Sequence, residues 1–335
     1  MIVIDEKRIF EVIHERKPRS VALNGPEGLI AKIQDTADNI MEKFGIPAYI
    51  IGDTCWGSCD LNTHAADMLG AEVLFNIGHT IATETFGEKV VMVNAYDNIS
   101  FDEVSRKCAL GLLKDSKYRS LSLLTDSQHL NQIAYVKNIF EEYGYNIIIG
   151  RGKGQLNNAQ VFGCEFYPAY DSQKQVDAYV FLGQSTFHSA SVAMSTGKPT
   201  YMLDPYFNEY SQVNEFAKAL QKKAILSIYK ALNAERIGVI IGLKEGQFAQ
   251  VRALELKKSF EQLGKKVQLI ALTDITDDRL QSFKGIDAFV QVACPRIAID
   301  DHFKKPMLSV PQALAMIKLL KKEPIDNFLM KWHWL

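Results

Sequence analysis

The residues in this sequence best suited to chemistry are its five cysteines, Cys55, Cys59, Cys108, Cys164 and Cys294. Five cysteines in 335 residues are too few for a disulfide scaffold, so we expect reduced thiols. Three of them, Cys59, Cys164 and Cys294, lie in loops that follow predicted β-strands. Ligands of parallel α/β units bind at the carboxyl ends of the strands, so these three thiols are placed where a ligand would bind.

Three thiols without an obvious fourth are compatible with few kinds of metal centre. A structural zinc ion normally takes four protein ligands at close local spacing, and the sequence has no paired CxxC motif. A [4Fe–4S] cluster held by three cysteines leaves one iron open for a substrate, which suits catalysis. The three cysteines form no local motif, so three buried core cysteines remain the alternative interpretation.

The pair Cys55 and Cys59 has the spacing C-x3-C, which begins the CxxxCxxC motif of ordinary radical enzymes that use S-adenosylmethionine. The third cysteine of that motif would fall at Asn62, so the ordinary motif is absent. We expect Cys55 not to be a ligand, and we expect Cys108 to pack inside an amphipathic helix.

Three turns after predicted first strands are candidates for binding a carboxylate or phosphate, because each opens a helix with unpaired backbone N–H groups. Simple helix capping is the alternative for each turn, and neither a G-x-G-x-x-G nor a Walker pattern is present. The turns are 24–28, 125–128 and 242–247, with Asn24, Gly25, Glu27, Gly28, Lys244, Gly246 and Gln247 as candidate ligand-binding residues.

Polar residues also follow the predicted third strands. Gln184, Ser185 and His188 are candidate binding residues. His79 and His188 could also serve in hydrogen bonding or acid–base chemistry, although a lone histidine is more often structural. Arg296, two residues after Cys294, could clamp a substrate carboxylate, with a surface salt bridge as the alternative. The pair 300–301, two aspartates, could orient Arg296 or cap a helix.

The elements that must position these residues alternate between apolar strands and helices, which predicts an α/β fold with parallel sheets. The order strand, turn, helix, strand, helix, strand and strand recurs three times, which indicates a triplicated α/β unit. The predicted domains are 1–97, 98–208 and 209–335, and packing around a shared central site would let their cysteines converge. The predicted strands are 20–24, 48–52, 72–77, 90–94, 120–124, 146–150, 178–182, 200–203, 236–241, 267–272, 288–292 and 307–309.

Other segments complete this organisation. Residues 1–17 predict an amphipathic helix rather than a signal peptide, and residues 209–233 predict a long helix that leads into the third domain. Linkers are expected at 95–100 and 204–209. The aromatic segment 331–334 could dock on another unit or subunit.

Charge and composition exclude several classes of protein. The chain has 38 Lys and Arg against 39 Asp and Glu, without the basic excess typical of nucleic-acid binders. No apolar run is long enough for a membrane helix. Apolar residues make up 47% of the chain, which supplies real hydrophobic cores. We expect a cytoplasmic protein that binds neither nucleic acid nor membrane.

Six stretches together resemble the archaeal diphthamide biosynthesis enzymes, the 2-(3-amino-3-carboxypropyl)histidine synthases. They are GDTCWGSCD, GCEFYPA, LGQSTFHSA, LDPY, GLKEGQ and ACPRIAIDD, and the resemblance covers nearly the whole chain. It implies three similar α/β domains and a [4Fe–4S] cluster with one cysteine from each, at Cys59, Cys164 and Cys294. It also implies a homodimer that acts on elongation factor 2.

The reaction implied by this resemblance starts the formation of diphthamide. A reduced cluster cleaves S-adenosylmethionine between the sulfur and the γ-carbon, the 3-amino-3-carboxypropyl group is added to C2 of a histidine on elongation factor 2, and methylthioadenosine leaves. An external electron donor is required. The alternatives are a non-catalytic iron–sulfur or electron-transfer subunit of such an enzyme, and a zinc-stabilised binding protein.

Overall fold

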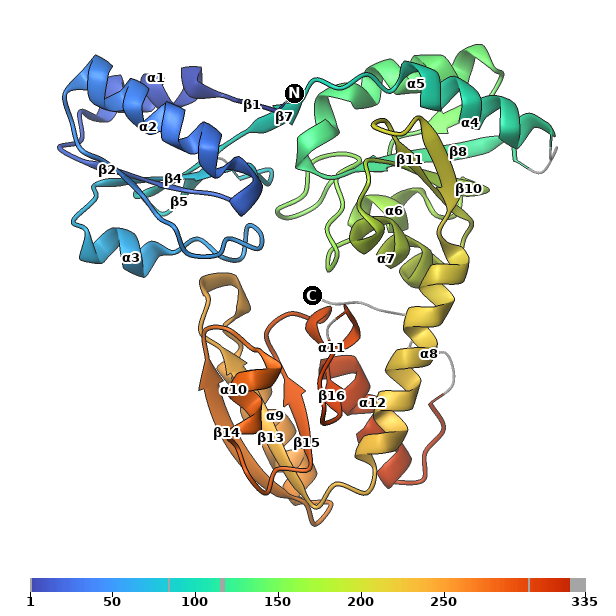
Figure 1. The fold of residues 1–335 in the computed structure, drawn as a ribbon. Coiled ribbons are helices and arrows are strands. Elements are labelled where there is room, and N and C mark those ends of the chain that lie inside the picture. Colours follow the sequence, from blue (N-terminus) through green and yellow to red (C-terminus); the bar gives the residue numbers. More distant parts are fainter. Residues whose placement is uncertain (1, 84, 115–117, 301, 326–335) are drawn as a thin grey trace. The chain divides into compact units, whose positions relative to one another are not determined.

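The computed structural model describes residues 2–83, 85–114, 118–300 and 302–325 (Figure 1). Within them, helices alternate with strands along the chain, and the strands form three larger sheets and one two-stranded sheet. The fold class is α/β with several parallel sheets, which confirms the prediction from the strand pattern.

The first sheet has five strands in the order β3-β2-β4-β6-β5. The pairs β2–β3, β2–β4 and β4–β6 are parallel, and β5 runs antiparallel to β6. These strands are β2 (Val21–Asn24), β3 (Ala48–Ile50), β4 (Val73–Ile77), β5 (Thr85–Phe86) and β6 (Val90–Val93), and the helices of this region are α1 (Glu6–Arg16), α2 (Ile30–Phe44) and α3 (Thr63–Met68).

The second sheet has the order β12-β11-β10-β8-β9, with β8 parallel to both β10 and β9. Its strands are β8 (Ser120–Thr125), β9 (Asn146–Ile148), β10 (Ala178–Leu182), β11 (Thr200–Asp204) and β12 (Glu209–Gln212). The helices of this stretch of chain are α4 (Asp102–Lys114), α5 (Ile133–Glu142), α6 (Tyr167–Ser172) and α7 (Thr186–Thr196).

The third sheet has the order β14-β13-β15-β16, and all of its pairs are parallel. Its strands are β13 (Arg236–Gly242), β14 (Lys266–Leu272), β15 (Ala288–Gln291) and β16 (Met307–Leu308). The accompanying helices are α8 (Asn214–Ala231), α9 (Gln250–Glu261), α10 (Asp277–Gln281), α11 (Ile297–Asp300) and α12 (Val310–Leu320).

The three larger sheets share one local arrangement that places the candidate residues. The first strand of each lies beside the third, as β2–β4, β8–β10 and β13–β15, so the chain changes direction across each sheet at that pair. Ligands bind outside the carboxyl ends of strands at such a point. A short 3₁₀ helix follows each first strand, at Glu27–Leu29, Ser127–Gln132 and Glu245–Gln247, where the sequence predicts a turn that opens a helix.

The helices around the sheets are held by ordinary amphipathic packing. In α2, Ile33, Ala37 and Ile40 are buried at helical spacing against the first sheet. The helix ends at Gly45, whose φ of 66° is the left-handed conformation that glycine adopts readily. The third sheet has its own core around Val239, Val290 and other buried side chains of β13, β15, α8, α9 and α12.

All twelve predicted strands are present within a residue or two of their expected ends, whereas the expected linkers and long helix need correction. Residues 95–97 of the expected linker form β7 (Ala95–Asp97), which pairs antiparallel with β1 (Ile2–Ile4). The N-terminal helix therefore begins only at Glu6, after Asp5 accepts a capping hydrogen bond from the backbone of Arg8.

The helix predicted over 209–233 begins at Asn214, because residues 209–212 form β12 beside β11. The side chain of Asn214 accepts a hydrogen bond from the N–H of Thr200 at 2.8 Å and donates to the carbonyl of Lys198. These bonds fix the start of α8 to the preceding strand. The aromatic segment 331–334 and residue 301 lie outside the described residues.

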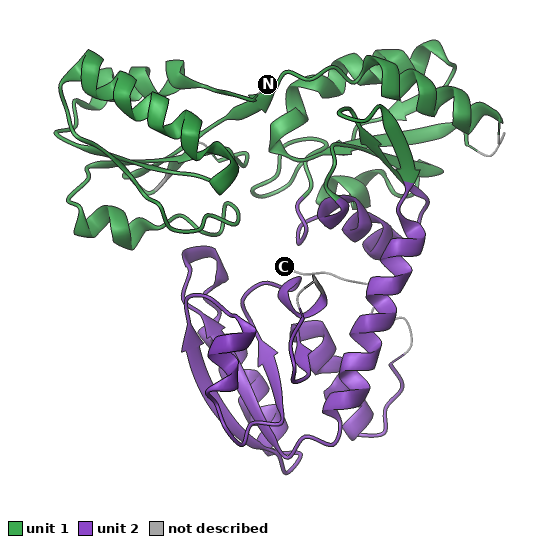
Figure 2. Cartoon of the chain, viewed as in Figure 1, with its two compact units in different colours: residues 1–161, 167–185, 201–211 green, residues 162–166, 186–200, 212–335 purple. Residues whose placement is uncertain are grey.

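The chain divides into two compact units (Figure 2). Unit 1 comprises residues 1–161, 167–185 and 201–211, and unit 2 comprises residues 162–166, 186–200 and 212–335. The predicted three-domain division after residues 97 and 208 stays a prediction, although each predicted segment supplies one of the larger sheets apart from β12. Within the described ranges, no helix has the length and apolar content to cross a membrane.

Candidate functional site

Cys59 lies in the loop of residues 51–62, which joins β3 to α3 in unit 1. The loop has a buried side and an exposed side. Cys55 and Asp60 are 5% and 1% exposed, Cys59 is half-buried, and Trp56 is 74% exposed. The Cys59 thiol is thus accessible at the surface of a loop whose other side is anchored in the unit.

A network of buried amides anchors this loop, and it begins at the adjacent carboxyl ends of β2 and β4. Asn24 and Asn76 are fully buried register partners, and Nδ2 of Asn24 donates to Oδ1 of Asn76 at 2.8 Å. The same Nδ2 donates to the carbonyl oxygen of Asp60 at 3.1 Å. Nδ2 of Asn62 in turn donates to Oδ1 of Asn24 at 2.9 Å. The residues after Cys59 are therefore tied to the sheet.

Cys55 belongs to the same network as a protonated thiol. Its Sγ lies 3.4 Å from Nδ2 of Asn24, 3.5 Å from the Asp60 carbonyl oxygen and 3.7 Å from Nδ1 of His79. Burial, and after it the negative charge of Asp60, raises the pKa of Cys55 to about 12. Burial lowers the pKa of His79 to about 4. Because a thiol binds metal as the thiolate, this environment supports the prediction that Cys55 is not a ligand.

Cys294 lies three residues after the end of β15 in unit 2, in a turn fixed by a different side chain. Gln291, which is 1% exposed, donates from Nε2 to the Cys294 carbonyl oxygen at 2.5 Å. Its Oε1 accepts a hydrogen bond from the N–H of Ala293 at 2.9 Å. One amide side chain thereby holds both sides of the turn, and the Cys294 thiol is half-buried.

Arg296 is buried, so the surface salt bridge offered as its alternative role is wrong. Its Nη1 donates to the carbonyl oxygen of Phe187 in α7 at 2.5 Å, and its guanidinium lies 4.2 Å from the centre of the Phe187 ring. Its predicted contact with a substrate carboxylate stays a prediction.

Cys164 lies in the segment 162–166, which belongs to unit 2. The N–H of Phe162 donates to the carbonyl oxygen of Glu165 at 2.9 Å, which closes a tight turn around the cysteine. Gly163 is packed so closely against the ring of Phe187 that a Cβ atom added there would overlap the ring. Cys164 is half-buried, as Cys59 and Cys294 are.

The remaining candidates lie in varied surroundings. Asn24 is committed to the amide network, and a Cβ at Gly25 would lie 2.7 Å from a carbon of Ile33, so glycine at this position has a packing reason. Gln184 donates to both carboxylate oxygens of Asp204, at 3.0 and 3.1 Å. Lys244 is buried and pairs with Asp274 at 3.3 Å. Glu27, Gly28 and Gly246 are exposed, whereas Ser185, His188 and Gln247 are half-buried.

The three predicted ligand cysteines are distributed over both units. Cys164 and Cys294 belong to unit 2 and Cys59 to unit 1. Among the described residues, no three His, Cys, Asp or Glu side chains are grouped as a metal site. The donor set nevertheless fits an iron–sulfur cluster, because these three thiols are half-buried in loops that follow strands, while Cys55 and Cys108 are buried. Burial raises the pKa of Cys108 in α4, as expected for a packing residue.

Sequence reasoning missed Asn76, Gln291, Gly163 and Phe187. A usable signal existed for the first two, since each is an amide inside an otherwise apolar strand, in VLFNI and AFVQV. A polar residue in a buried strand must find partners, so it often marks a site. No comparable signal distinguishes Phe187 or Gly163, because their contact joins segments far apart in the sequence.

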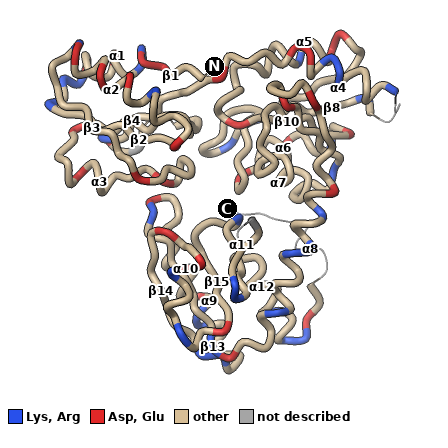
Figure 3. The backbone as a smooth tube through the Cα atoms, viewed as in Figure 1, with Lys and Arg blue, Asp and Glu red and all other residues tan. Residues whose placement is uncertain are grey.

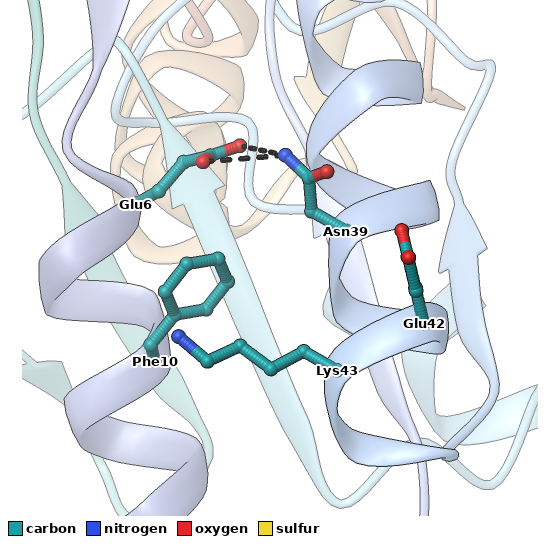
Figure 4. A pocket seen from close by; sticks show the side chains of 5 residues that line it. All are labelled: Glu6, Phe10, Asn39, Glu42 and Lys43. Carbon is teal, nitrogen blue, oxygen red and sulfur yellow. Dashed lines mark hydrogen bonds between the residues drawn. The ribbon is translucent and has the colours of Figure 1, made fainter.

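A cavity of about 260 Å³ lies elsewhere, between α1 and α2 (Figure 4). Asn39 donates to Glu6 at 3.1 Å, and Nζ of Lys43 lies 4.2 Å from the centre of the Phe10 ring. None of the predicted site residues lines it. Basic and acidic residues occur together over both units (Figure 3), which agrees with the near-zero net charge.

Comparisons with known proteins agree with the resemblance noted in the sequence. The family model described as "Putative diphthamide synthesis protein" matches residues 25–327. The 2-(3-amino-3-carboxypropyl)histidine synthase of Pyrococcus horikoshii is 27% identical over 97% of this chain and 94% of its own length. Subunit 1 of the Gallus gallus synthase is 28% identical over 94% of this chain and 78% of its own length.

A solved structure is similar over nearly the whole chain. The crystal structure of Dph2 from Pyrococcus horikoshii with a 4Fe-4S cluster aligns with a TM-score of 0.86 at 27% identity. The alignment covers 95% of this chain and 92% of that one. The likeness thus extends over nearly the whole α/β fold.

Proposed function

Because the chain belongs to the diphthamide synthesis family, we propose that it is a 2-(3-amino-3-carboxypropyl)histidine synthase. It is a transferase that moves the 3-amino-3-carboxypropyl group of S-adenosylmethionine to C2 of a histidine, the first step of diphthamide biosynthesis. The protein that carries this histidine is elongation factor 2. The observation that carries the proposal is the match over residues 25–327, which includes all three loop cysteines.

Cys59, Cys164 and Cys294 are the residues that would hold a [4Fe–4S] cluster in this chain. When bound, such a cluster supplies the electron that cleaves the carbon–sulfur bond of S-adenosylmethionine and an iron site open to that substrate. The chain's own contribution is to hold the three thiols at the ends of rigid elements. The Asn24 network does so for the Cys59 loop, and Gln291 does so for the Cys294 turn.

Turns at the carboxyl ends of the central strands would bind S-adenosylmethionine. The exposed or half-buried residues Glu27, Gly28, Gln184, Ser185 and Gln247 are reachable by a ligand. Asp204 fixes the orientation of the Gln184 side chain through two hydrogen bonds. Such prior orientation lowers the entropy lost when a ligand binds. Lys244 is less accessible, and its ion pair with the partly exposed Asp274 would have to open for contact.

The partners are proposed on the same basis. The enzyme acts as a homodimer in the cytoplasm, modifies elongation factor 2 and takes electrons from an external donor. The balanced charge of the chain gives no support for direct binding to nucleic acid.

Anaerobic reconstitution with iron and sulfide, followed by reduction and addition of S-adenosylmethionine, tests the proposal. We expect methylthioadenosine as the product, lost in Cys59→Ala, Cys164→Ala and Cys294→Ala. The control is Cys108→Ala, a buried packing cysteine whose replacement should leave the product unchanged. Formation of 5′-deoxyadenosine would indicate ordinary radical chemistry. A cluster without any product would favour the alternative of a non-catalytic iron–sulfur subunit.

A further inference from the structure

Phe187 is the second residue of α7 and is 38% exposed, yet it has close contacts with two distant segments of unit 2. One segment is the turn around Cys164 and the other is the turn after Cys294. Both of these cysteines are proposed cluster ligands.

The first contact is with Arg296. The guanidinium stacks over the Phe187 ring, with 4.2 Å from its central carbon to the ring centre, and it also donates to the Phe187 carbonyl oxygen at 2.5 Å. A planar cation that is 2% exposed and held in two ways has little freedom. Since Arg296 lies two residues after Cys294, the position of the Cys294 turn is tied to the start of α7.

The second contact is with Gly163, the residue directly before Cys164. A Cβ built on Gly163 would overlap ring carbons Cε1, Cζ and Cδ1 of Phe187. The φ angle of Gly163 is not in the left-handed region, so close approach of the ring, and not backbone conformation, is the reason for glycine. The ring of Phe187 thus lies directly on the backbone that carries Cys164.

We propose that Phe187 is a positioning residue that fixes the Cys164 turn relative to the Cys294 turn, through a stack of Gly163, the Phe187 ring and the Arg296 guanidinium. This inference rests on the proposed function, because it takes Cys164 and Cys294 to be ligands of one cluster. Loss of a residue that orients metal ligands typically lowers metal affinity or activity by roughly 10- to 100-fold. The stack contributes here by setting the separation of two thiols before the cluster binds.

The test compares Phe187→Ala with Phe216→Ala, which removes another exposed phenylalanine of unit 2 (48% exposed, in α8). Iron and sulfide per chain and the electron paramagnetic resonance signal of the reduced cluster are measured after reconstitution. Thermal unfolding of the metal-free proteins checks the fold. We expect Phe187→Ala to bind the cluster on the order of 10-fold more weakly, with an altered signal, and to unfold within a few degrees of the wild type. Phe216→Ala should match the wild type.

A second arm uses the overlap at Gly163. Gly163→Ala should lower cluster loading, because the new methyl group displaces the ring or the Cys164 turn. Adding Phe187→Ala removes the ring and therefore the overlap, so the double variant should load no worse than Phe187→Ala alone. Additive losses would instead show that the Phe187 ring and the Gly163 backbone do not interact.

The outcomes separate this inference from the proposed function. Absence of a cluster in the wild type would overturn the proposed function and the inference with it. A wild type that binds a cluster, together with a Phe187→Ala protein of unchanged loading and signal, would overturn only the inference. Additive effects of Gly163→Ala and Phe187→Ala would do the same.

Discussion

The loop around Cys59 and the turn around Cys294 show two ways to present a thiol at the end of a parallel strand. The Cys59 loop is long and is anchored by three asparagines, a protonated thiol and backbone carbonyls, all in unit 1. The Cys294 turn is short and is closed by one glutamine, with Arg296 extending to α7. A long loop needs a buried network, whereas a short turn needs a single clamp.

The amide side chains that anchor the Cys59 loop and the Cys294 turn nevertheless occupy equivalent positions in their sheets. Asn76 and Gln291 each lie on the third strand of their sheet, two residues before Gly78 and Ala293 respectively, and each faces a residue of the first strand. The second sheet has Phe181 at the corresponding position, paired with Leu124. In that sheet Thr125 donates from Oγ1 to the Leu182 carbonyl oxygen instead. The cysteine of that repeat, Cys164, belongs to unit 2, whereas β8 and β10 belong to unit 1.

The largest effect is expected from breaking the network under the Cys59 loop. Asn24→Leu leaves the Asn76 Oδ1, the Asp60 carbonyl oxygen and the Asn62 Nδ2 without their partner in a buried site. We expect the free energy of unfolding to fall by about 3 kcal/mol, the combined cost of several unsatisfied buried groups. Urea unfolding measures it. Asn39→Leu, at an exposed asparagine, is the control, and equal losses in both variants would contradict the network.

Lowering the pH should reduce the stability of unit 1, because two of its histidines are buried. Burial lowers the pKa of His79 and of His129 to about 4, so neither gains a proton as readily as in the unfolded chain, where the pKa is 6.5. The folded state therefore loses stability as the pH falls from about 6.5 towards 4. Asp126 opposes this, because burial raises its pKa to about 6 and the folded state holds that proton more tightly.

A variant separates the contribution of His79 from the others. Between pH 7 and 5, His79→Gln should lose about 2 kcal/mol less stability than the wild type, since one depressed histidine no longer contributes. Urea unfolding at both pH values is the measurement. His14→Gln, at an exposed position of α1, serves as the control. Identical pH dependence of the wild type and His79→Gln would show that His79 titrates normally.

Removing the Gln291 side chain that closes the Cys294 turn should lower the free energy of unfolding less than Asn24→Leu does. Gln291→Leu removes two hydrogen bonds, but the Cys294 turn is half-exposed, so water can replace part of them. We expect a loss of about 1 kcal/mol in the free energy of unfolding together with weaker cluster binding. Iron content after reconstitution and urea unfolding are measured in parallel. A loss as large as that of Asn24→Leu would contradict the distinction between network and clamp.

Features of the fold that depend on short segments of the chain could be predicted from the sequence, whereas features that depend on contacts between distant segments could not. The strands, their order along the chain and the loop positions of Cys59, Cys164 and Cys294 follow from apolar patterns and local spacing, which are properties of short segments. The sequence pattern predicts helix over residues 209–212, but Glu209–Gln212 forms β12 because it pairs with β11, and this pairing overrides the local preference.

The devices that hold the cysteines could not be predicted in the same way. The partners of Asn24 lie 31 to 52 residues away, and Phe187, the partner of Arg296, lies 109 residues away. Such contacts appear only when the sheets have formed. Arg296 shows the limit well, because the residue type fits both a substrate clamp and a buried brace, and only its burial and its contact with Phe187 distinguish the two.

The smallest effect is expected on the exposed side of the Cys59 loop. Trp56 is 74% exposed, and its backbone N–H, which no side-chain substitution removes, donates to Oδ2 of Asp60 at 3.3 Å. Trp56→Ala should therefore change the free energy of unfolding by less than about 0.5 kcal/mol, as surface substitutions usually do. Urea unfolding and iron content are the measurements, and both should match the wild type. A loss approaching that of Asn24→Leu would mean that the indole, and not the buried amides, supports the loop, and the contrast with the Cys294 turn would then have to be redrawn.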